Sequence, residues 1–191
     1  MRFMKYSSID SSNCTQLTDE WNLIYDLDKK FLVKLFFQVI IICCYAFGLG
    51  YSLFYLDNLL MNVGIFLLLL ILSYLIMLIP HELVHYICYP NKDNVIIKHN
   101  LLKLKFTACI DGTISKQLAL ISLILPFIIF SIIPSIIIYL SSFNLFLYAI
   151  ASANAIKSSK DIYNYIFIIK NISKNELLKI NEHGIYLRCD A

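Results

Sequence analysis

The sequence predicts an all-α integral membrane protein: a four-transmembrane-helix bundle with a short cytoplasmic β-hairpin-like insertion between spans two and three. Three observations lead to this fold class. Hydrophobic residues make up 59% of the 191-residue chain and charged residues only 15%, whereas a soluble domain carries about 25% charge. The mean hydropathy is +0.71, and apolar runs long enough to cross a bilayer recur along the chain. Lysine and arginine are confined to one set of connections, as expected for loops on the inner side of a membrane.

The composition divides the chain into three parts. Residues 1–28 are mixed and polar and contain no apolar segment of a signal peptide, so they predict a cytoplasmic lead-in. Within this lead-in, Trp21 and Tyr25 would share a face if the segment were helical, and would then suit the membrane interface. Residues 29–170 predict the four-span membrane domain, and residues 171–191 predict a cytoplasmic tail.

The four spans follow from the apolar runs. We expect them at 31–55, at 59–89, at 118–140 and from 143 through 161, with apolar residues continuing to 169. Pro80 lacks the N–H that would donate to the carbonyl of Ile76, which predicts a kink or a fresh helical start just before His81. Pro126 and Pro134 predict kinks in the third span.

The basic residues predict the orientation of the bundle. The sixteen lysines and arginines lie in the N-terminal region, at the start of the first span (Lys34), in the 90–117 connection, at the end of the fourth span or in the tail, and the turns at 57–58 and 141–142 have none. The positive-inside rule therefore places those two turns outside and both termini in the cytoplasm of a multi-pass cell membrane protein. The lysines are accounted for by topology, and nothing indicates binding to nucleic acid.

The 90–117 connection has the pattern of short strands. In its second half Lys103 and Lys105 alternate with Leu104 and Phe106, which favours a hairpin turning around His99 and Asn100. Such a hairpin could pair with the backbone of an extended substrate or could simply cover the site, and the pattern is compatible with both.

The sequence His81-Glu82-Leu83-Val84-His85 closes the second apolar run. On a helix the two histidines, spaced i and i+4, project from one face and can bind one metal ion, while Glu82 lies close enough to act as a base without being a ligand. Ionisable groups at the edge of the hydrocarbon are costly and usually functional. Solvated or hydrogen-bonded side chains at the interface are the simpler alternative. The six cysteines show no C-x-x-C spacing that would indicate another zinc site.

A catalytic zinc usually has three protein ligands and one open position. Asp161 is the best candidate for the third, because it follows the outer turn by about 19 residues and the motif follows its own turn by about 22, a difference in depth of only about 5 Å. An ordinary interfacial aspartate paired with Lys157 or Lys160 is the alternative for this residue. The other candidates are Asp93, His99, Asp111, Glu182 and His183.

These residues resemble a known group. The HExxH, the basic extended connection, the 115–126 stretch and the segment from Asn154 to Tyr163 are similar to a small family of membrane zincin peptidases, once catalogued as a domain of unknown function, and more distantly to site-2-protease intramembrane metalloproteases. The resemblance covers most of residues 55–170. It implies that His81, His85 and Asp161 hold Zn²⁺, that Glu82 is the catalytic base and that Asn154 steadies the substrate carbonyl.

The sequence therefore predicts a zinc-dependent, membrane-embedded metalloprotease that hydrolyses peptide bonds near the cytoplasmic face. Its expected partners are the lipid bilayer and a peptide or transmembrane protein substrate. A catalytically inactive zinc-binding membrane protein with a structural, partner-binding or sensing role is the alternative. A di-iron oxidase is disfavoured, because that chemistry needs more His and carboxylate ligands than the four histidines of this chain readily supply.

Overall fold

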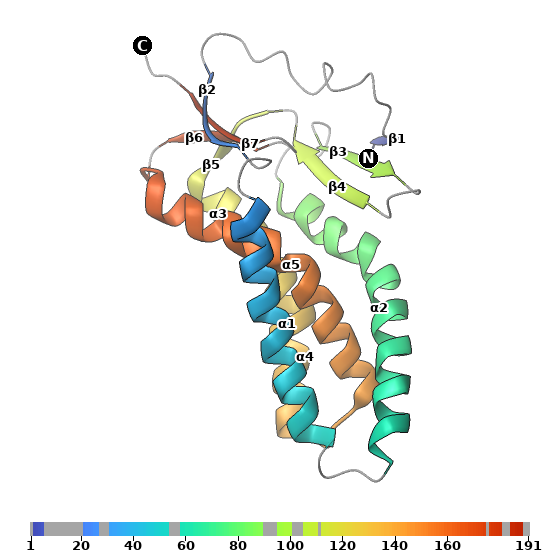
Figure 1. The fold of residues 1–191 in the computed structure, drawn as a ribbon. Coiled ribbons are helices and arrows are strands. Elements are labelled where there is room, and N and C mark those ends of the chain that lie inside the picture. Colours follow the sequence, from blue (N-terminus) through green and yellow to red (C-terminus); the bar gives the residue numbers. More distant parts are fainter. Residues whose placement is uncertain are drawn as a thin grey trace.

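The computed structural model describes residues 2–5, 21–26, 31–53, 58–89, 95–100, 105–110, 112–174, 176–180 and 184–188. In this part of the chain, long helices form one end of the molecule and two small sheets lie together at the other end (Figure 1). The prediction of a mostly helical protein is confirmed, and the sheets are more extensive than the single predicted hairpin.

The first two helices agree closely with the predicted spans. Helix α1 covers Phe31–Leu53 and α2 covers Leu59–Cys88. The reversal between them ends at Asn58, which is the one described non-glycine residue with a positive φ (61°), a conformation that asparagine tolerates well. Pro80 lies inside α2 rather than at a fresh helical start. Figure 1 shows the last turns of α2 leaning away from the axis of the earlier turns, as a proline inside a helix requires.

The third predicted span is one helical segment with an irregular middle. Helix α3 (Lys116–Phe127) passes into a π-helical turn, η3 (Ile128–Ile132), and then into α4 (Ile133–Leu140). Within this turn the N–H of Ile133 donates to the carbonyl of Ile128, five residues back. Pro126 and Pro134 flank the π turn, so the predicted irregularity lies where these prolines remove backbone donors.

Helix α5 (Leu145–Asn171) is the central element of the bundle. It contacts α1, α2, α3 and α4, and it begins where the Asn144 side chain accepts a hydrogen bond from the N–H of Leu147 (2.9 Å). Four of its alanines are fully buried, at positions 149, 151, 153 and 155. Small side chains let neighbouring helices approach closely, which explains why this helix can be surrounded.

The strands form two sheets at the end of the molecule to which α2 delivers the HExxH. One sheet has the order β1-β3-β4, with β1 (Arg2–Lys5) parallel to β3 (Val95–Asn100) and β3 antiparallel to β4 (Lys105–Ile110). The predicted hairpin is thus confirmed, but His99 and Asn100 are paired within β3, opposite Phe106 and Lys105, and do not form the turn.

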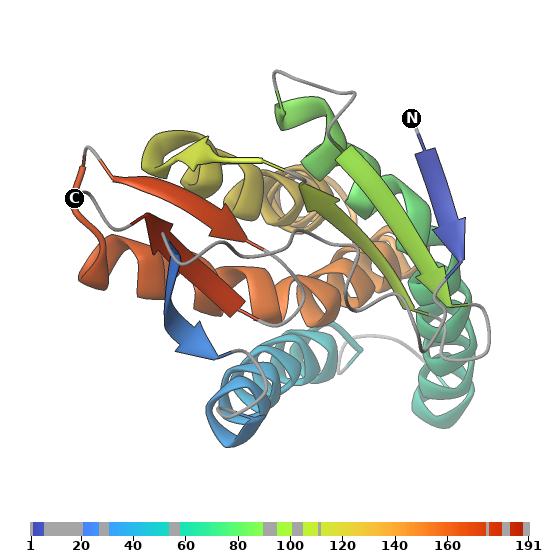
Figure 2. The same ribbon diagram turned by 90° about the horizontal axis from the view of Figure 1, so that it is seen from above.

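The second sheet joins the two ends of the chain. Its order is β2-β7-β6-β5, formed by Trp21–Asp26, Gly184–Arg188, Leu177–Ile180 and Ile114–Ser115. Because β2 is a strand, Trp21 and Tyr25 do not share a helical face as we considered above. The C-terminal strands are also more than a polar tail. Strands β6 and β7 lie close to the C-terminal part of α5 (Figure 2), and Leu178 and Ile185 are fully buried in one core cluster with Ile168 of that helix.

Three helical segments in the described part of the chain are long and apolar enough to cross a membrane: 35–52 within α1, the whole of α2, and the continuous 116–140 segment. Helix α5 has 27 residues, about 40 Å at 1.5 Å per residue, which also suffices to cross a bilayer. It carries Lys157, Lys160, Asp161 and Lys170, so its composition is less apolar than that of the other three.

Candidate metal centre

Two helices from distant parts of the chain supply the polar side chains of the candidate site. The last turns of α2 present His81, Glu82 and His85, all of which are buried. Helix α5 faces them with Asn154, Lys157, Ser158 and Asp161, which are spaced i, i+3, i+4 and i+7 and therefore lie on one face. The site forms only because these two helices pack side by side.

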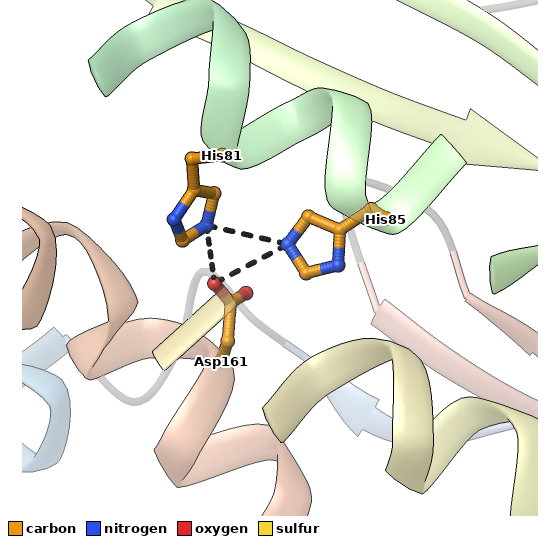
Figure 3. A group of neighbouring side chains, drawn as sticks. All are labelled: His81, His85 and Asp161. Atoms are coloured by element: carbon orange, nitrogen blue, oxygen red, sulfur yellow. Dashed lines mark hydrogen bonds and ion pairs between the residues drawn. The ribbon is translucent and has the colours of Figure 1, made fainter. Parts of the chain in front are cut away.

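His81, His85 and Asp161 converge on one point (Figure 3). The Nε2 atom of His81 lies 3.0 Å from Oδ2 of Asp161 and 3.3 Å from Nε2 of His85, and Nε2 of His85 lies 3.6 Å from the same carboxylate oxygen. Zinc–nitrogen and zinc–oxygen bonds of about 2.0–2.1 Å in a tetrahedron place neighbouring ligand atoms about 3.3 Å apart. The triangle of donor atoms therefore has the size that a tetrahedral zinc requires.

Asn154 fixes the orientation of His81. Its Nδ2 donates to the carbonyl of Pro126 (3.0 Å) and to Oγ of Ser131 (2.8 Å), and since a carbonyl only accepts, this defines which end of the amide is Oδ1. Oδ1 lies 2.8 Å from Nδ1 of His81, so that ring nitrogen must be the donor. The lone pair of His81 then lies on Nε2, directed at the metal position.

The resemblance implied that Asn154 contacts a substrate carbonyl, and the structure gives it a different place. The side chain is fully buried, and both its oxygen and its nitrogen are already bonded within the protein. A buried amide with its groups in use orients a neighbour rather than a substrate. Asn154 is therefore a positioning residue for His81.

His85 has a comparable partner that the sequence analysis missed. Its Nδ1 lies 3.2 Å from Oγ of Ser122, and that hydroxyl donates its own hydrogen to the Tyr89 hydroxyl (3.1 Å). Since the serine hydrogen is used there, His85 Nδ1 must be the donor, and its lone pair also lies on Nε2. Ser122 is fully buried on α3 near the start of the third span. The sequence signal that could have identified this partner of His85 is the single polar residue Ser122 within an otherwise apolar run.

The hydrogen-bond pattern makes the site suitable for a cation. With both Nδ1 atoms donating outward, two imidazole lone pairs and a carboxylate oxygen face one another within 3.6 Å. Buried acceptors without a donor are costly, and a divalent metal between them satisfies all three. Two histidines and one carboxylate form a known ligand set for catalytic zinc.

Glu82 lies beside this triangle and contacts a different residue of α5. Its Oε1 accepts a hydrogen bond from Nζ of Lys157 at 2.9 Å, and the side chains are only 9% and 10% exposed. Lys157 therefore pairs with Glu82, whereas Asp161 faces the two histidines. The alternative interpretation, in which Asp161 is an ordinary interfacial acid paired with Lys157, is therefore not what the structure has.

The other candidate ligands are not brought to this point by any described contact. Asp93, Asp111, Glu182 and His183 lie outside the described residues. His99 is described only as a backbone position of β3, paired opposite Phe106. Among the described residues, the one group of His, Cys, Asp or Glu with metal-binding geometry is His81, His85 and Asp161.

The fold and the site together define a helical protein with apolar helices and a His-His-Asp centre, in which two buried histidines at the end of α2 meet a partly buried aspartate of α5. A family model described as "Putative zincin peptidase" matches residues 74–176, which is more than half of the chain and includes every residue of the site described above. The chain belongs to this family, and the family description indicates a zinc-dependent peptidase. No curated protein and no solved structure matches the chain.

Proposed function

We propose that this protein is a membrane-embedded zinc metallopeptidase that hydrolyses peptide bonds of membrane or membrane-associated substrates. The observation that carries the proposal is the convergence of Nε2 of His81, Nε2 of His85 and Oδ2 of Asp161, with the Glu82 carboxylate beside them. The family membership supports zinc and peptidase chemistry. The reaction is of the kind performed by site-2-protease intramembrane metalloproteases.

Each residue has a defined part in the proposed reaction. His81, His85 and Asp161 would hold the metal, which when bound makes water nucleophilic at neutral pH and polarises the scissile carbonyl. Glu82 accepts the proton of the attacking water and gives it to the leaving amine, so it serves as general base and then as general acid. Asn154 and Ser122 keep both histidine rings in the tautomer that a metal needs.

We propose four spans, with α5 as the fourth. Lys157 and Asp161 lie on the face that meets α2, and Lys170 lies near the C-terminal end, so these three residues need not face lipid. The basic residues then place both termini and the sheets in the cytoplasm of a cell membrane protein. This arrangement gives the site access to water from the cytoplasmic side, which hydrolysis requires.

The expected substrate is a transmembrane or membrane-associated peptide. The turns proposed to lie outside are short, so no bulky external domain guides substrates from that side. Strand β4 is at the edge of its sheet and contacts α2. We propose that an extended substrate pairs with this edge, since an edge strand offers unpaired backbone groups to a second strand.

Zinc content tests the proposal. One zinc per chain is expected in detergent-purified wild type by elemental analysis, with zinc lost in His85→Ala and Asp161→Ala because each removes a ligand. Glu82→Gln should keep the metal, because Glu82 is not a ligand. Wild type without zinc, purified without chelators, would refute the metal site.

Cleavage distinguishes the enzyme from the alternative of an inactive zinc-binding protein. We expect wild type to cleave a pooled library of hydrophobically anchored, quenched fluorescent peptides of randomised sequence, in micelles. Glu82→Gln should be slower by about 10²–10⁴-fold, the usual contribution of a general acid–base group. A wild type that binds zinc but cleaves no faster than Glu82→Gln would favour the structural, partner-binding or sensing role.

A further inference from the structure

A lysine buried in the middle of the site is not explained by the proposed reaction. Lys157 lies on α5 one turn after Asn154 and one turn before Asp161, and its side chain is only 10% exposed. Lysines near membrane ends normally extend their ammonium group to water, as the exposed Lys170 on the same helix can do. Lys157 instead directs its ammonium to the Glu82 carboxylate at 2.9 Å.

The contact joins the proposed base to the helix that carries the proposed third ligand. Glu82 comes from α2, and both Lys157 and Asp161 come from α5. A charge-assisted hydrogen bond is shorter and stronger than a neutral one, and breaking a buried ion pair by removing one partner is strongly destabilising. The position of Glu82 is thereby set by the same helix that sets the position of Asp161.

We propose that Lys157 is the positioning residue of Glu82 in peptide hydrolysis. This inference rests on the proposed function. Lys157 holds the carboxylate on the α5 side of the metal position, so that base and ligands keep a fixed mutual geometry whenever α2 and α5 are packed together. Such preorganisation matters because a general base must be within hydrogen-bond reach of the proton it accepts, and a misplacement of about 1 Å can slow a reaction about 100-fold.

The first test is a stability cycle that does not depend on activity. Metal-free wild type, Lys157→Met, Glu82→Gln and the double variant are unfolded thermally in detergent. Lys157→Met should have the lowest unfolding temperature, because it removes the Lys157 ammonium from the buried Glu82 carboxylate, and Glu82→Gln in that background should recover stability. Lys170→Met is the matched control, an exposed lysine of the same helix, and should behave as wild type. Additive effects in the cycle would overturn the pairing itself.

The second test asks whether the pair serves catalysis. With the anchored peptide library, Lys157→Met should lower the apparent kcat by at least about tenfold, with apparent KM within about twofold of wild type and one zinc per chain retained. Lys157→Arg should restore kcat to within about threefold, because a guanidinium keeps the charge and the hydrogen bond. In the Glu82→Gln background, Lys157→Met should cause no further loss.

The outcomes separate this inference from the proposed function. A kcat of Lys157→Met equal to that of wild type, an equal loss in the Glu82→Gln background, or loss of zinc would overturn the positioning role while leaving the peptidase intact. A wild type with zinc but without Glu82-dependent cleavage would overturn the proposed function and with it the role of Lys157, although the stability cycle would still detect the ion pair.

Discussion

Replacing Asn154 by alanine tests the internal support of the metal site. The change removes the acceptor of His81 Nδ1 and the donor to the Pro126 carbonyl, both in a fully buried position. Loss of such a supporting partner typically weakens metal binding about 10–100-fold, or about 1.4–2.7 kcal/mol. Two buried groups left without partners cost about 1–3 kcal/mol each, so we expect the metal-free protein to lose about 2–6 kcal/mol of stability as well.

The two effects separate in a second variant. Asn154→Asp keeps an acceptor for His81 but loses the donor to Pro126. It should therefore bind zinc within about threefold of wild type, since carboxylates commonly support metal-binding histidines, while still being less stable. Ser152→Ala is the control, because this buried serine on the same helix bonds to the Tyr148 carbonyl (2.7 Å) and is not part of the His81 network.

The assay is competition for zinc between the purified protein and a chromophoric chelator, combined with thermal unfolding of the metal-free form. We expect a raised zinc Kd for Asn154→Ala and an unchanged Kd for Ser152→Ala. If Asn154→Ala bound zinc as tightly as wild type while being destabilised, the amide would be only a packing element, and its assigned role in orienting His81 would be refuted.

Two further predictions concern other contacts. Ser122→Ala should raise the zinc Kd by about tenfold, at the lower end for supporting residues, because His85 loses its acceptor; an unchanged Kd in the chelator competition would contradict this. Gly48→Ala should lower the free energy of unfolding by about 1–3 kcal/mol, as overpacking does, because the new Cβ would lie 2.5 Å from the Tyr148 hydroxyl, whereas Gly50 has nothing within 4 Å. Chemical unfolding in detergent should therefore give a lower stability for Gly48→Ala than for Gly50→Ala. Adding Tyr148→Phe to Gly48→Ala should restore the free energy of unfolding. Equal stabilities of the two alanine variants would contradict this prediction and show that α1 can shift away from Tyr148 without a loss of stability.

Local sequence pattern was sufficient for the helices and for the meeting of His81, His85 and Asp161. Apolar runs of span length are strong signals. The second and fourth predicted spans run in the same direction, and Asp161 lies at nearly the same depth along its span as the two histidines do along theirs. This comparison predicted that the three side chains meet. The hairpin at 95–110 was also predicted, because alternation along a strand is a local property.

The remaining features depend on partners far away in the chain. Strand β2 (Trp21–Asp26) pairs with β7 (Gly184–Arg188). The two strands have only six and five residues, and neither segment alone carries a sequence pattern strong enough to predict a strand. The roles of Asn154 and Lys157 depend on which side chain of α2 each one meets, and helical spacing leaves both choices open. Only the packing of α5 against α2 decides that Lys157 meets Glu82 and Asn154 meets His81.

The separation of His81 and Asp161 by 80 residues has a consequence for biosynthesis. Ribosomes make α2 first, so in the membrane arrangement that we propose its two histidines and Glu82 would reach the bilayer well before α5 has been made. The apolar turns that precede Pro80 must therefore retain α2 in the membrane unaided against the unfavourable insertion of polar groups. In a nascent chain that ends before α5, the two imidazoles are present without Asp161, and Glu82 is present without Lys157. The order of synthesis thus delays assembly of the His81, His85 and Asp161 group until α5 has been made.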